Sequence, residues 1–346
     1  MTIFKPLSAD DRVSTKTLLH EAIPITGTIV SGTYAGGNIQ NFTHGMFQSV
    51  YDYPYLSSSA NHIFDITFGT ADTSVLAVTN QIAKKDNVYN QMAQSLMGYD
   101  QNGAIQKFDE DGNLTTTGDK ITEAIFLPFS RLLSKDEVKK GSFSMTIGVS
   151  ASYSTDSTSV NPGVFKKLLT ISDVNAATSY KVNSPAGEYG ILYVTASSAS
   201  PVGDQSLDVA STHTASINGV TYWRAGLIYY QAGIAVLTSS MFMAKTDGGY
   251  LDGTSADTVK FFNASTSLTG SLISEEISGS ADALRNRIQN IQFNNTIELN
   301  STVYFCRAKH NEFNYSANPT YLTGSQVRVK NQATDAPISY ITSIGL

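Results

Sequence analysis

The C-terminal run, residues 291–346, constrains the fold of this chain most strongly, because its apolar positions follow the period of a β-strand. Apolar side chains recur at every second or fourth position on both sides of a short polar pair: Ile291, Phe293, Ile297, Leu299, Val303 and Phe305. The polar pair between the two halves is Asn300-Ser301, which favours a turn. The pattern predicts a β-hairpin with one buried face.

The residues after this hairpin predict contacts with other subunits. Residues 309–319 form a polar arm with two aromatic anchors, Phe313 and Tyr315, and Pro319 prevents helix beyond it. We expect the arm to lie in a neighbour's groove or to augment a neighbour's sheet. The final run, residues 338–346, is strongly β-prone and contains Tyr340, Ile341 and Ile344. It is expected to pair backwards or with another subunit, as an unfinished edge in an assembly would.

The composition limits the kinds of partner. Charged residues make up 15% of the 346 residues, against roughly a quarter in average globular proteins. Ser, Thr, Asn and Gln must therefore cover much of the surface. The net charge is −6, and the local basic groups are only the pairs Lys84-Lys85, Lys139-Lys140 and Lys166-Lys167. Phosphate binding needs clustered cations, so nucleic acid is not predicted as a main partner.

Cysteine usage and hydropathy limit the chemistry and the compartment. Cys306 is the only cysteine of the sequence, which excludes an intramolecular disulfide and a Cys-rich zinc site. Its place in a strand pattern predicts a small buried residue. The first residues lack the pattern of a secretory signal. No apolar run approaches the ~20 residues of a membrane span. We expect synthesis and folding in a cytoplasm, with no membrane partner.

Residues 1–149 are predicted to form a mixed portion with helices and strands. A helix is expected to begin at Ser8 and to stop before Pro24. A second, clearer helix covers about residues 80–97, with Gly98 in the left-handed position after its end. A capping box at residues 134–137 predicts a short helix that ends at Gly141. Strands are expected at residues 63–68, 125–127 and 143–149.

The rest of the chain predicts a β-domain followed by a C-terminal segment. Charge thins out in residues 150–280, where short β runs at 189–195, 220–230 and 234–238 are separated by polar turns. Residues 281–346 add a helix near 280–290, with Arg285 and Arg287 off its apolar side, then the hairpin and the arm. The predicted class is mainly β with a few helices (α+β), with antiparallel sheets and a β-sandwich-like domain inserted in a mixed N- and C-terminal domain.

Motifs for catalysis or metal binding are weak. Residues 109–113 resemble the start of a calcium loop, but the glycine comes two positions early and no glutamate closes the loop, so a surface turn is expected. The five histidines lack the i, i+4 spacing of a helical metal site. Nucleophile-elbow, phosphate-loop and dinucleotide-binding motifs are absent from the sequence. We therefore predict no enzyme activity, cofactor, metal or small-molecule substrate.

Two aromatic groups are candidate contact surfaces. Residues 220–230 carry the only tryptophan, Trp223, beside Arg224 and near Tyr229. Trp, Tyr and Arg dominate interface hot spots, but alternate members of a strand can equally fill a core, and both interpretations remain open. The second group concentrates three tyrosines around a proline: Tyr51, Tyr53 and Tyr55. Tyrosines this close either pack as a rigid corner or present a contact surface.

Four runs of the sequence carry a family resemblance. They are VYFCRAKHNEFNYSANPT at 303–320, SYITSIGL at 339–346, HGMFQSVYDYPY at 44–55 and GLIYYQAGIAV at 226–236. Together they resemble structural proteins of tailed bacteriophages with T4-like contractile tails. The resemblance spans most of the chain. It implies a virion component of the tail or baseplate, made in the host cytoplasm.

The expected partners are copies of the chain and other virion proteins, with a mechanical role. Two alternatives remain: a receptor- or glycan-binding tail protein, because β surfaces rich in Ser, Thr, Asn and Tyr also suit saccharides, and a capsid decoration protein.

Overall fold

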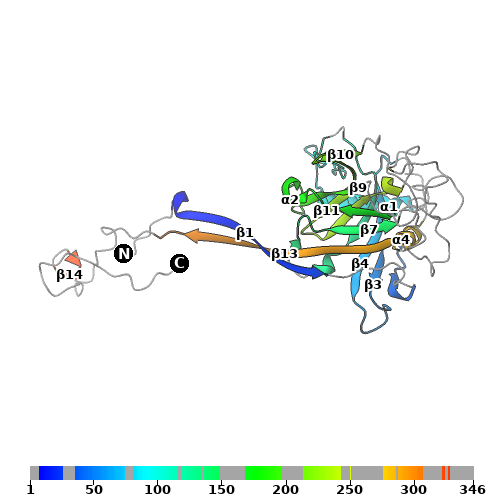
Figure 1. Cartoon of the computed structure of the whole chain (residues 1–346), viewed down its shortest axis with the longest axis horizontal. Coiled ribbons are helices and arrows are strands. Elements are labelled where there is room, and N and C mark those ends of the chain that lie inside the picture. The colour runs from blue at the N-terminus through cyan, green and yellow to red at the C-terminus, as the bar shows by residue number, and fades with distance from the viewer. Residues whose placement is uncertain are drawn as a thin grey trace. The chain divides into compact units, whose positions relative to one another are not determined.

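The computed structural model describes residues 8–25, 36–74, 81–115, 118–133, 136–148, 168–195, 213–242, 250, 276–285, 287–306, 322–323 and 326–327. The fold is mainly β, with antiparallel sheets and a few helices, as the sequence predicted (Figure 1). The helices are α1 (Ile82–Leu96), α2 (Ala176–Ser179) and α4 (Ile277–Arg285). Short 3-10 turns are η1 (Ala9–Asp11), η2 (Gly36–Asn38), η3 (Ser130–Leu132) and η5 (Ser239–Phe242). None of the helices in the described residues is long and apolar enough to cross a membrane.

One large sheet joins most of the strands. Its order is β1 (Arg12–Ile25), β13 (Ile288–Tyr304), β7 (Ser144–Gly148), β8 (Leu168–Ser172), β9 (Tyr189–Thr195), β11 (Val220–Tyr229), β12 (Ile234–Thr238), β5 (Glu123–Pro128), β4 (His62–Thr70), β3 (Gln48–Tyr51) and β2 (Ile39–Asn41). Off this path, β10 (Thr214–Ile217) pairs with β11, and β6 (Glu137–Val138) pairs with β13. A separate small sheet pairs β14 (Leu322–Thr323) with β15 (Gln326–Val327).

The chain divides into two compact units. Unit 1 comprises Met1–Thr17 and Leu299–Leu346, and unit 2 comprises Leu18–Glu298. The segments 1–149, 150–280 and 281–346 expected from composition do not follow this division. Strands β8, β9, β11 and β12 from the middle segment lie between β7 and β5 in the large sheet. Backbone pairing between segments that are distant in sequence sets this arrangement.

Unit 2 has a buried core on each face of its central strands. Along β5, Ile125 and Leu127 belong to the larger core, whereas Ala124 and Phe126 belong to the other. The larger core also takes Met145 from β7 and residues of β4 and β3, which lie far along the strand order. The sheet therefore curves around this core. Period-two alternation on strands that are buried on both faces produces the two cores.

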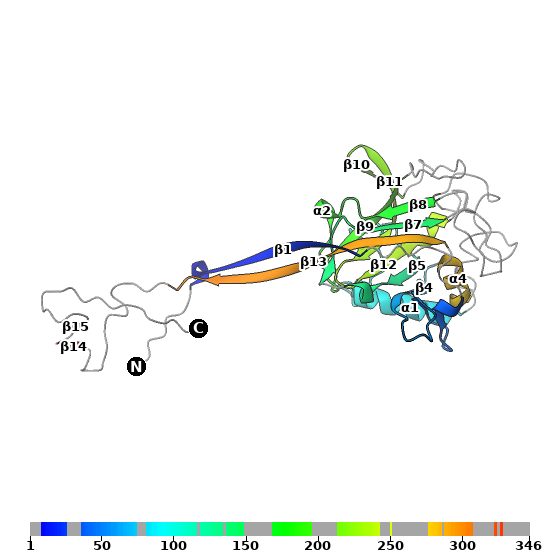
Figure 2. The same cartoon turned by 60° about the horizontal axis from the view of Figure 1, so that its bottom comes forward.

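Helix α1 covers the second core, as the sequence predicted for residues 80–97. Its buried face includes Val88, Tyr89, Ala93 and Leu96. The Tyr89 hydroxyl donates to the Ile121 carbonyl at 2.7 Å and accepts from the Phe108 amide at 3.2 Å. Gly98 follows the helix at φ +79°, as expected for the left-handed position. Both α1 and α4 contact β4 (Figure 2).

A β-bulge in β11 changes which side chains face which core. The register of β11 against β9 shifts between Arg224 and Gly226. Gly226 has φ +150°, and a Cβ there would collide with the Val236 carbonyl oxygen of β12. Before the bulge Trp223 faces the larger core; after it Tyr229, a residue of the same parity, faces the second core. The extra residue thus reverses the alternation of the strand.

The predicted hairpin at the C-terminal run and the predicted N-terminal helix are both wrong. Strand β13 runs without a turn from Ile288 to Tyr304, through Asn300-Ser301, and its partner is β1. Ser8 does cap a helical turn and forms a capping box with Asp11, but only the three-residue turn η1 follows before β1 begins. Pairing between these two distant strands outweighs both the local turn signal and the local helix signal.

Three smaller predictions are corrected and six strands are confirmed. Glu137 belongs to strand β6 instead of a helix, because it pairs with Thr296 of β13. The helix expected near 280–290 is α4, which already ends at Arg285, and both Arg285 and Arg287 are buried. Cys306 is exposed, not buried, because it lies in unit 1 just beyond the end of β13. The strands expected at 63–68, 125–127, 143–149, 189–195, 220–230 and 234–238 are present.

Candidate functional site

The candidate interface of unit 1 is a two-stranded ribbon formed by residues 11–15 and 299–305. In Figures 1 and 2, β1 lies beside β13. The hydroxyls of Ser14 and Thr302 are 3.2 Å apart, and those of Thr15 and Ser301 are 2.7 Å apart. The Phe305 amide donates to the Asp11 carbonyl at 2.8 Å. These pairs define one antiparallel register, in which Val13 lies opposite Val303.

Apolar side chains of this ribbon are about half exposed to solvent. Their exposed fractions lie between 45% for Val13 and 50% for Phe305, with Leu299, Val303 and Tyr304 in between. Strand β13 is therefore buried where it crosses unit 2, at Ile291 and Phe293, and exposed in unit 1. A strand pair with half-exposed valine, leucine and phenylalanine is suited to contact with another molecule.

The three neighbouring tyrosines form a corner with an exposed tip. Tyr51 is half-buried, and its hydroxyl donates to Gln40 Oε1 at 2.9 Å. Tyr53 is 57% exposed, and Tyr55 is also exposed. Asp52 fixes the loop, since its carboxylate accepts from the Asn61 backbone amide at 2.6 Å and from Asn61 Nδ2 at 2.8 Å. The corner is thus both rigid and partly open, and it combines the two interpretations of the sequence.

Of the remaining predicted interface residues, three are buried or half-buried in unit 2, and the others lie outside the described residues. Trp223 and Tyr229 are fully buried, so burial favours the core interpretation for them. Arg224 is half-buried, and its amide donates to the His213 carbonyl at 3.0 Å. The other predicted contact residues lie outside the described residues: Phe313, Tyr315, Tyr340, Ile341 and Ile344.

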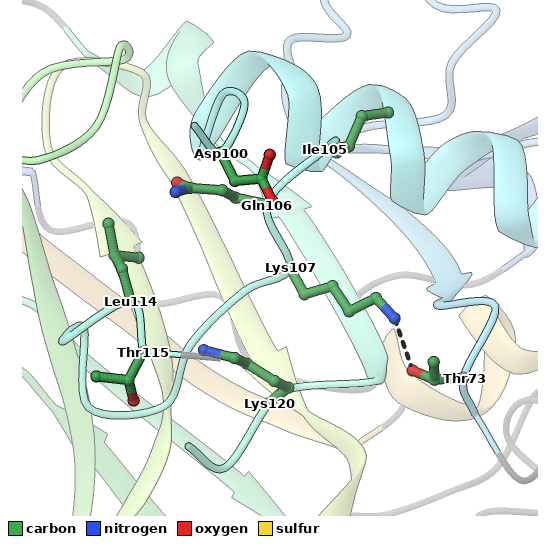
Figure 3. A pocket seen from close by; sticks show the side chains of 8 residues that line it. All are labelled: Thr73, Asp100, Ile105, Gln106, Lys107, Leu114, Thr115 and Lys120. Carbon is green, nitrogen blue, oxygen red and sulfur yellow. Dashed lines mark hydrogen bonds between the residues drawn. The ribbon is translucent and has the colours of Figure 1, made fainter. Parts of the chain in front are cut away.

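A pocket of about 400 Å³ opens beside the C-terminal end of α1 (Figure 3). Lys107 Nζ contacts Asp72 Oδ1 at 2.7 Å and donates to Thr73 Oγ1 at 2.9 Å. Lys120 pairs with Asp109. The other lining residues are Asp100, Ile105, Gln106, Leu114 and Thr115. Because carboxylates already compensate both lysines, the pocket has little to offer an anionic ligand.

The Asp109 turn is less exposed than the sequence suggested. Asp109 and Glu110 are buried, which corrects the expected surface turn. Asp109 Oδ1 accepts from the amides of Asp111 and Gly112, each at 3.1 Å, and its other oxygen pairs with Lys120. Lys120 therefore supplies the positive charge that a calcium ion would bring to such a loop. Burial raises the pKa of Asp109, and the Lys120 pair opposes that change.

Glu110, Asp119 and His213 form a cluster that the sequence did not predict. Their ligand atoms all lie within 4.8 Å of one another, a spacing that could hold a metal ion. His213 Nδ1 lies 2.7 Å from Glu110 Oε2, and this hydrogen bond raises the pKa of His213. Protonated His213 together with the nearby guanidinium of Arg224 balances the two carboxylates without an added cation. Glu110 and His213 are 103 residues apart, so no spacing signal could have found the cluster.

No protein-family model, no curated protein and no solved structure matches this chain.

Proposed function

We propose that this chain is a structural component of a contractile-tailed bacteriophage virion, in the tail or baseplate. It acts by assembling with copies of itself and with other virion proteins, and it has no reaction centre. It is synthesised in the cytoplasm of the bacterial host and incorporated into the particle there. The proposal starts from the family resemblance of its sequence.

The exposed ribbon of unit 1 is the observation that carries the proposal. A two-stranded ribbon by itself is marginally stable in water, and three or more strands or a covering element are needed for independent stability. Here both strands leave apolar side chains about half exposed, including Val13 and Phe305. A subunit interface supplies the missing cover. This arrangement is expected of a protein whose role is assembly.

The test is to locate the chain in purified particles of the phage that encodes it. Heads and tails are separated, and the chain is quantified in each fraction by mass spectrometry. We expect it in the tail fraction, at a fixed ratio to the other tail proteins. Its absence from mature particles would refute the proposal. Its presence on heads that lack tails would support a capsid decoration protein instead.

Receptor or glycan binding by a tail protein is a second proposal, favoured by the exposed Tyr53 ring. Aromatic faces can stack on apolar ligand faces. Trp223 cannot provide such a platform in this structure, because it is fully buried. We expect Tyr53→Ser to reduce binding on a glycan array or adsorption to host cells. Tyr99→Ser is the matched control, since Tyr99 is 54% exposed and lies elsewhere on unit 2. Equal effects of the two substitutions would exclude this role for Tyr53.

A further inference from the structure

The register of the ribbon determines which of its side chains share a face. Ser14 pairs with Thr302, and Thr15 pairs with Ser301. Successive residues of a strand point to opposite faces, so odd-numbered residues of both strands share one face and even-numbered residues share the other. The face with the odd-numbered residues, here called the ribbon face, carries Val13, Thr15, Leu299, Ser301, Val303 and Phe305. The opposite face carries Arg12, Ser14, Thr302 and Tyr304.

The ribbon face is apolar and almost free of charge. Four of its six side chains are apolar, and each of those four is 45–50% exposed. The one charged side chain of odd number in residues 11–15 and 299–305 is Asp11, at the end of the ribbon. Its carboxylate is turned back to Ser8, accepting from the Ser8 hydroxyl at 2.7 Å and from the Ser8 amide at 3.2 Å. Covering this face therefore desolvates no charge in its centre.

We propose that the ribbon face packs against the ribbon face of a second copy of this chain. The inference rests on the proposed function, because a virion subunit works in several copies, and it names the surface through which the copies meet. An uncharged apolar face is complementary to itself, so a symmetric contact brings valine, leucine and phenylalanine of both copies together. Two β faces packed this way lie about 10 Å apart, as in a sandwich.

Charge distribution favours a second copy over a charged partner. A basic or acidic partner would find no counter-charge along the ribbon face, whereas Arg12 on the opposite face stays in solvent when two ribbon faces meet. The contact is small, since a standard interface uses roughly 20–30 residues a side. Association through it is therefore weak in dilute solution and becomes strong where many copies are held close together, as in a particle.

Disulfide trapping tests which face meets the second copy. All variants carry the substitution Cys306→Ser, because Cys306 is exposed and would itself form cross-links. Ser301→Cys then places a thiol on the ribbon face, and Thr302→Cys places one on the opposite face of the neighbouring position. Each substitution removes one hydroxyl pair, so the two variants are matched. We expect linked dimers from Ser301→Cys under mild oxidation and few from Thr302→Cys. Equal linking, or linking only through position 302, would overturn the inference.

Charge substitution provides a second measurement that does not depend on oxidation. Val303→Lys puts a cation on the ribbon face, and Thr302→Lys puts one on the other face. Light scattering over a concentration series should show that Val303→Lys raises the concentration needed for association by about ten-fold or more. Thr302→Lys should behave like the unsubstituted chain, and thermal unfolding of both variants checks that unit 2 is folded. Equal shifts for both variants would contradict the inference.

The outcomes separate this inference from the proposed function. If the chain is present in purified tails but shows no face-specific linking, the inferred contact through the ribbon face is refuted and the proposed function stands. If the chain links through position 301 but is absent from particles, the ribbon contact stands and the proposed function is refuted.

Discussion

The buried carboxylate of Asp173 is held by donors from three other places in the chain. Asp173 is 1% exposed, and it accepts from the Gly141 amide at 2.7 Å, the Phe143 amide at 3.0 Å and the Tyr230 hydroxyl at 3.1 Å. Burial raises the pKa of Asp173, and these three donors oppose that change. Such a carboxylate joins the turn before β7 to the end of β8 and to the residue after β11. Its role is therefore stability.

Asp173→Ala should destabilise the fold by about 3 kcal/mol, because it leaves buried donors without their acceptor. Urea unfolding followed by fluorescence measures the change in the free energy of unfolding. Asp136→Ala is the control, because Asp136 is an exposed carboxylate, and a change within about 0.5 kcal/mol is expected there. Similar losses for the two variants would mean that the three donors find other partners.

The pair of His213 and Glu110 predicts a pH dependence of stability. The hydrogen bond to Glu110 raises the pKa of His213 above its ordinary value of 6.5. Its stabilising contribution is thus fully present below about pH 6.5 and is lost as pH rises through the folded-state pKa. Burial raises the pKa of Glu110, so the loss of the histidine charge also leaves a carboxylate that is costly to keep ionised. Both groups act in the same direction.

His213→Gln should therefore cost most in acidic solution. The unfolding temperatures of the parent chain and this variant are compared over a pH series. We expect the difference between them to be largest below about pH 6.5 and to shrink as the solution becomes alkaline. A difference that stays constant or grows with pH would show that the charge on His213 is not what holds this contact.

At the scale of elements, helix α1 lies directly on strand β4 at Gly69. A Cβ at that position would lie 2.8 Å from the Tyr89 backbone nitrogen, closer than packed atoms allow. The absence of a side chain lets the helix rest directly on the strand. This contact places Tyr89 so that its hydroxyl donates to the Ile121 carbonyl. The centroid of its ring lies 5.4 Å from the centroid of the Phe108 ring. One glycine therefore fixes the distance between the helix and the sheet.

Gly69→Ala should destabilise unit 2 by about 1–3 kcal/mol, because the backbone of α1 has to move away from β4. Chemical unfolding followed by circular dichroism checks the value. Gly37→Ala is the matched control, since a Cβ there meets nothing within 4 Å and Gly37 has no left-handed backbone conformation. If both changes cost the same, close packing is not the role of Gly69.

For the whole molecule, low charge determines how copies should associate. With 15% charged residues and an apolar ribbon face, the proposed contacts between copies depend on burial of apolar side chains and on backbone pairing. Salt screens charge pairs but does not weaken apolar burial, and sulfate strengthens it. Contacts of this kind persist when the ionic strength of the solution changes.

Association of the chain should therefore be insensitive to sodium chloride. We expect the oligomer distribution, measured by light scattering, to stay the same when the sodium chloride concentration is raised about ten-fold. Sodium sulfate should shift it toward larger species. Dissociation in sodium chloride would indicate that ion pairs, not the apolar ribbon face, hold the copies together.

Much of unit 2 could be predicted from sequence where the local pattern and the final contacts agree. The short β runs at 189–195 and 234–238 predicted strands β9 and β12 with the bounds that the structure has, and the helical period followed by Gly98 predicted α1. In these segments one apolar period is compatible with only one kind of element. The sequence also marked the tyrosine corner, because three tyrosines surround one proline, but it did not decide which of them are packed and which are exposed.

Other features could not be predicted without knowing which strand pairs with which. Asn300-Ser301 has turn chemistry, yet β1 pairs across it and keeps β13 straight, so the ribbon was missed. Trp223 and Tyr229 belong to different cores only because the bulge at Gly226 reverses the strand.

The sequence by itself determined the mainly β class, the low charge and the positions of most strands, because side-chain period and composition are local properties. The tertiary structure alone decided which strands meet, which face of each is covered and which carboxylates acquire a cationic neighbour. Those outcomes depend on backbone pairing between residues up to 288 positions apart, as between Ser14 and Thr302, and no local pattern encodes them.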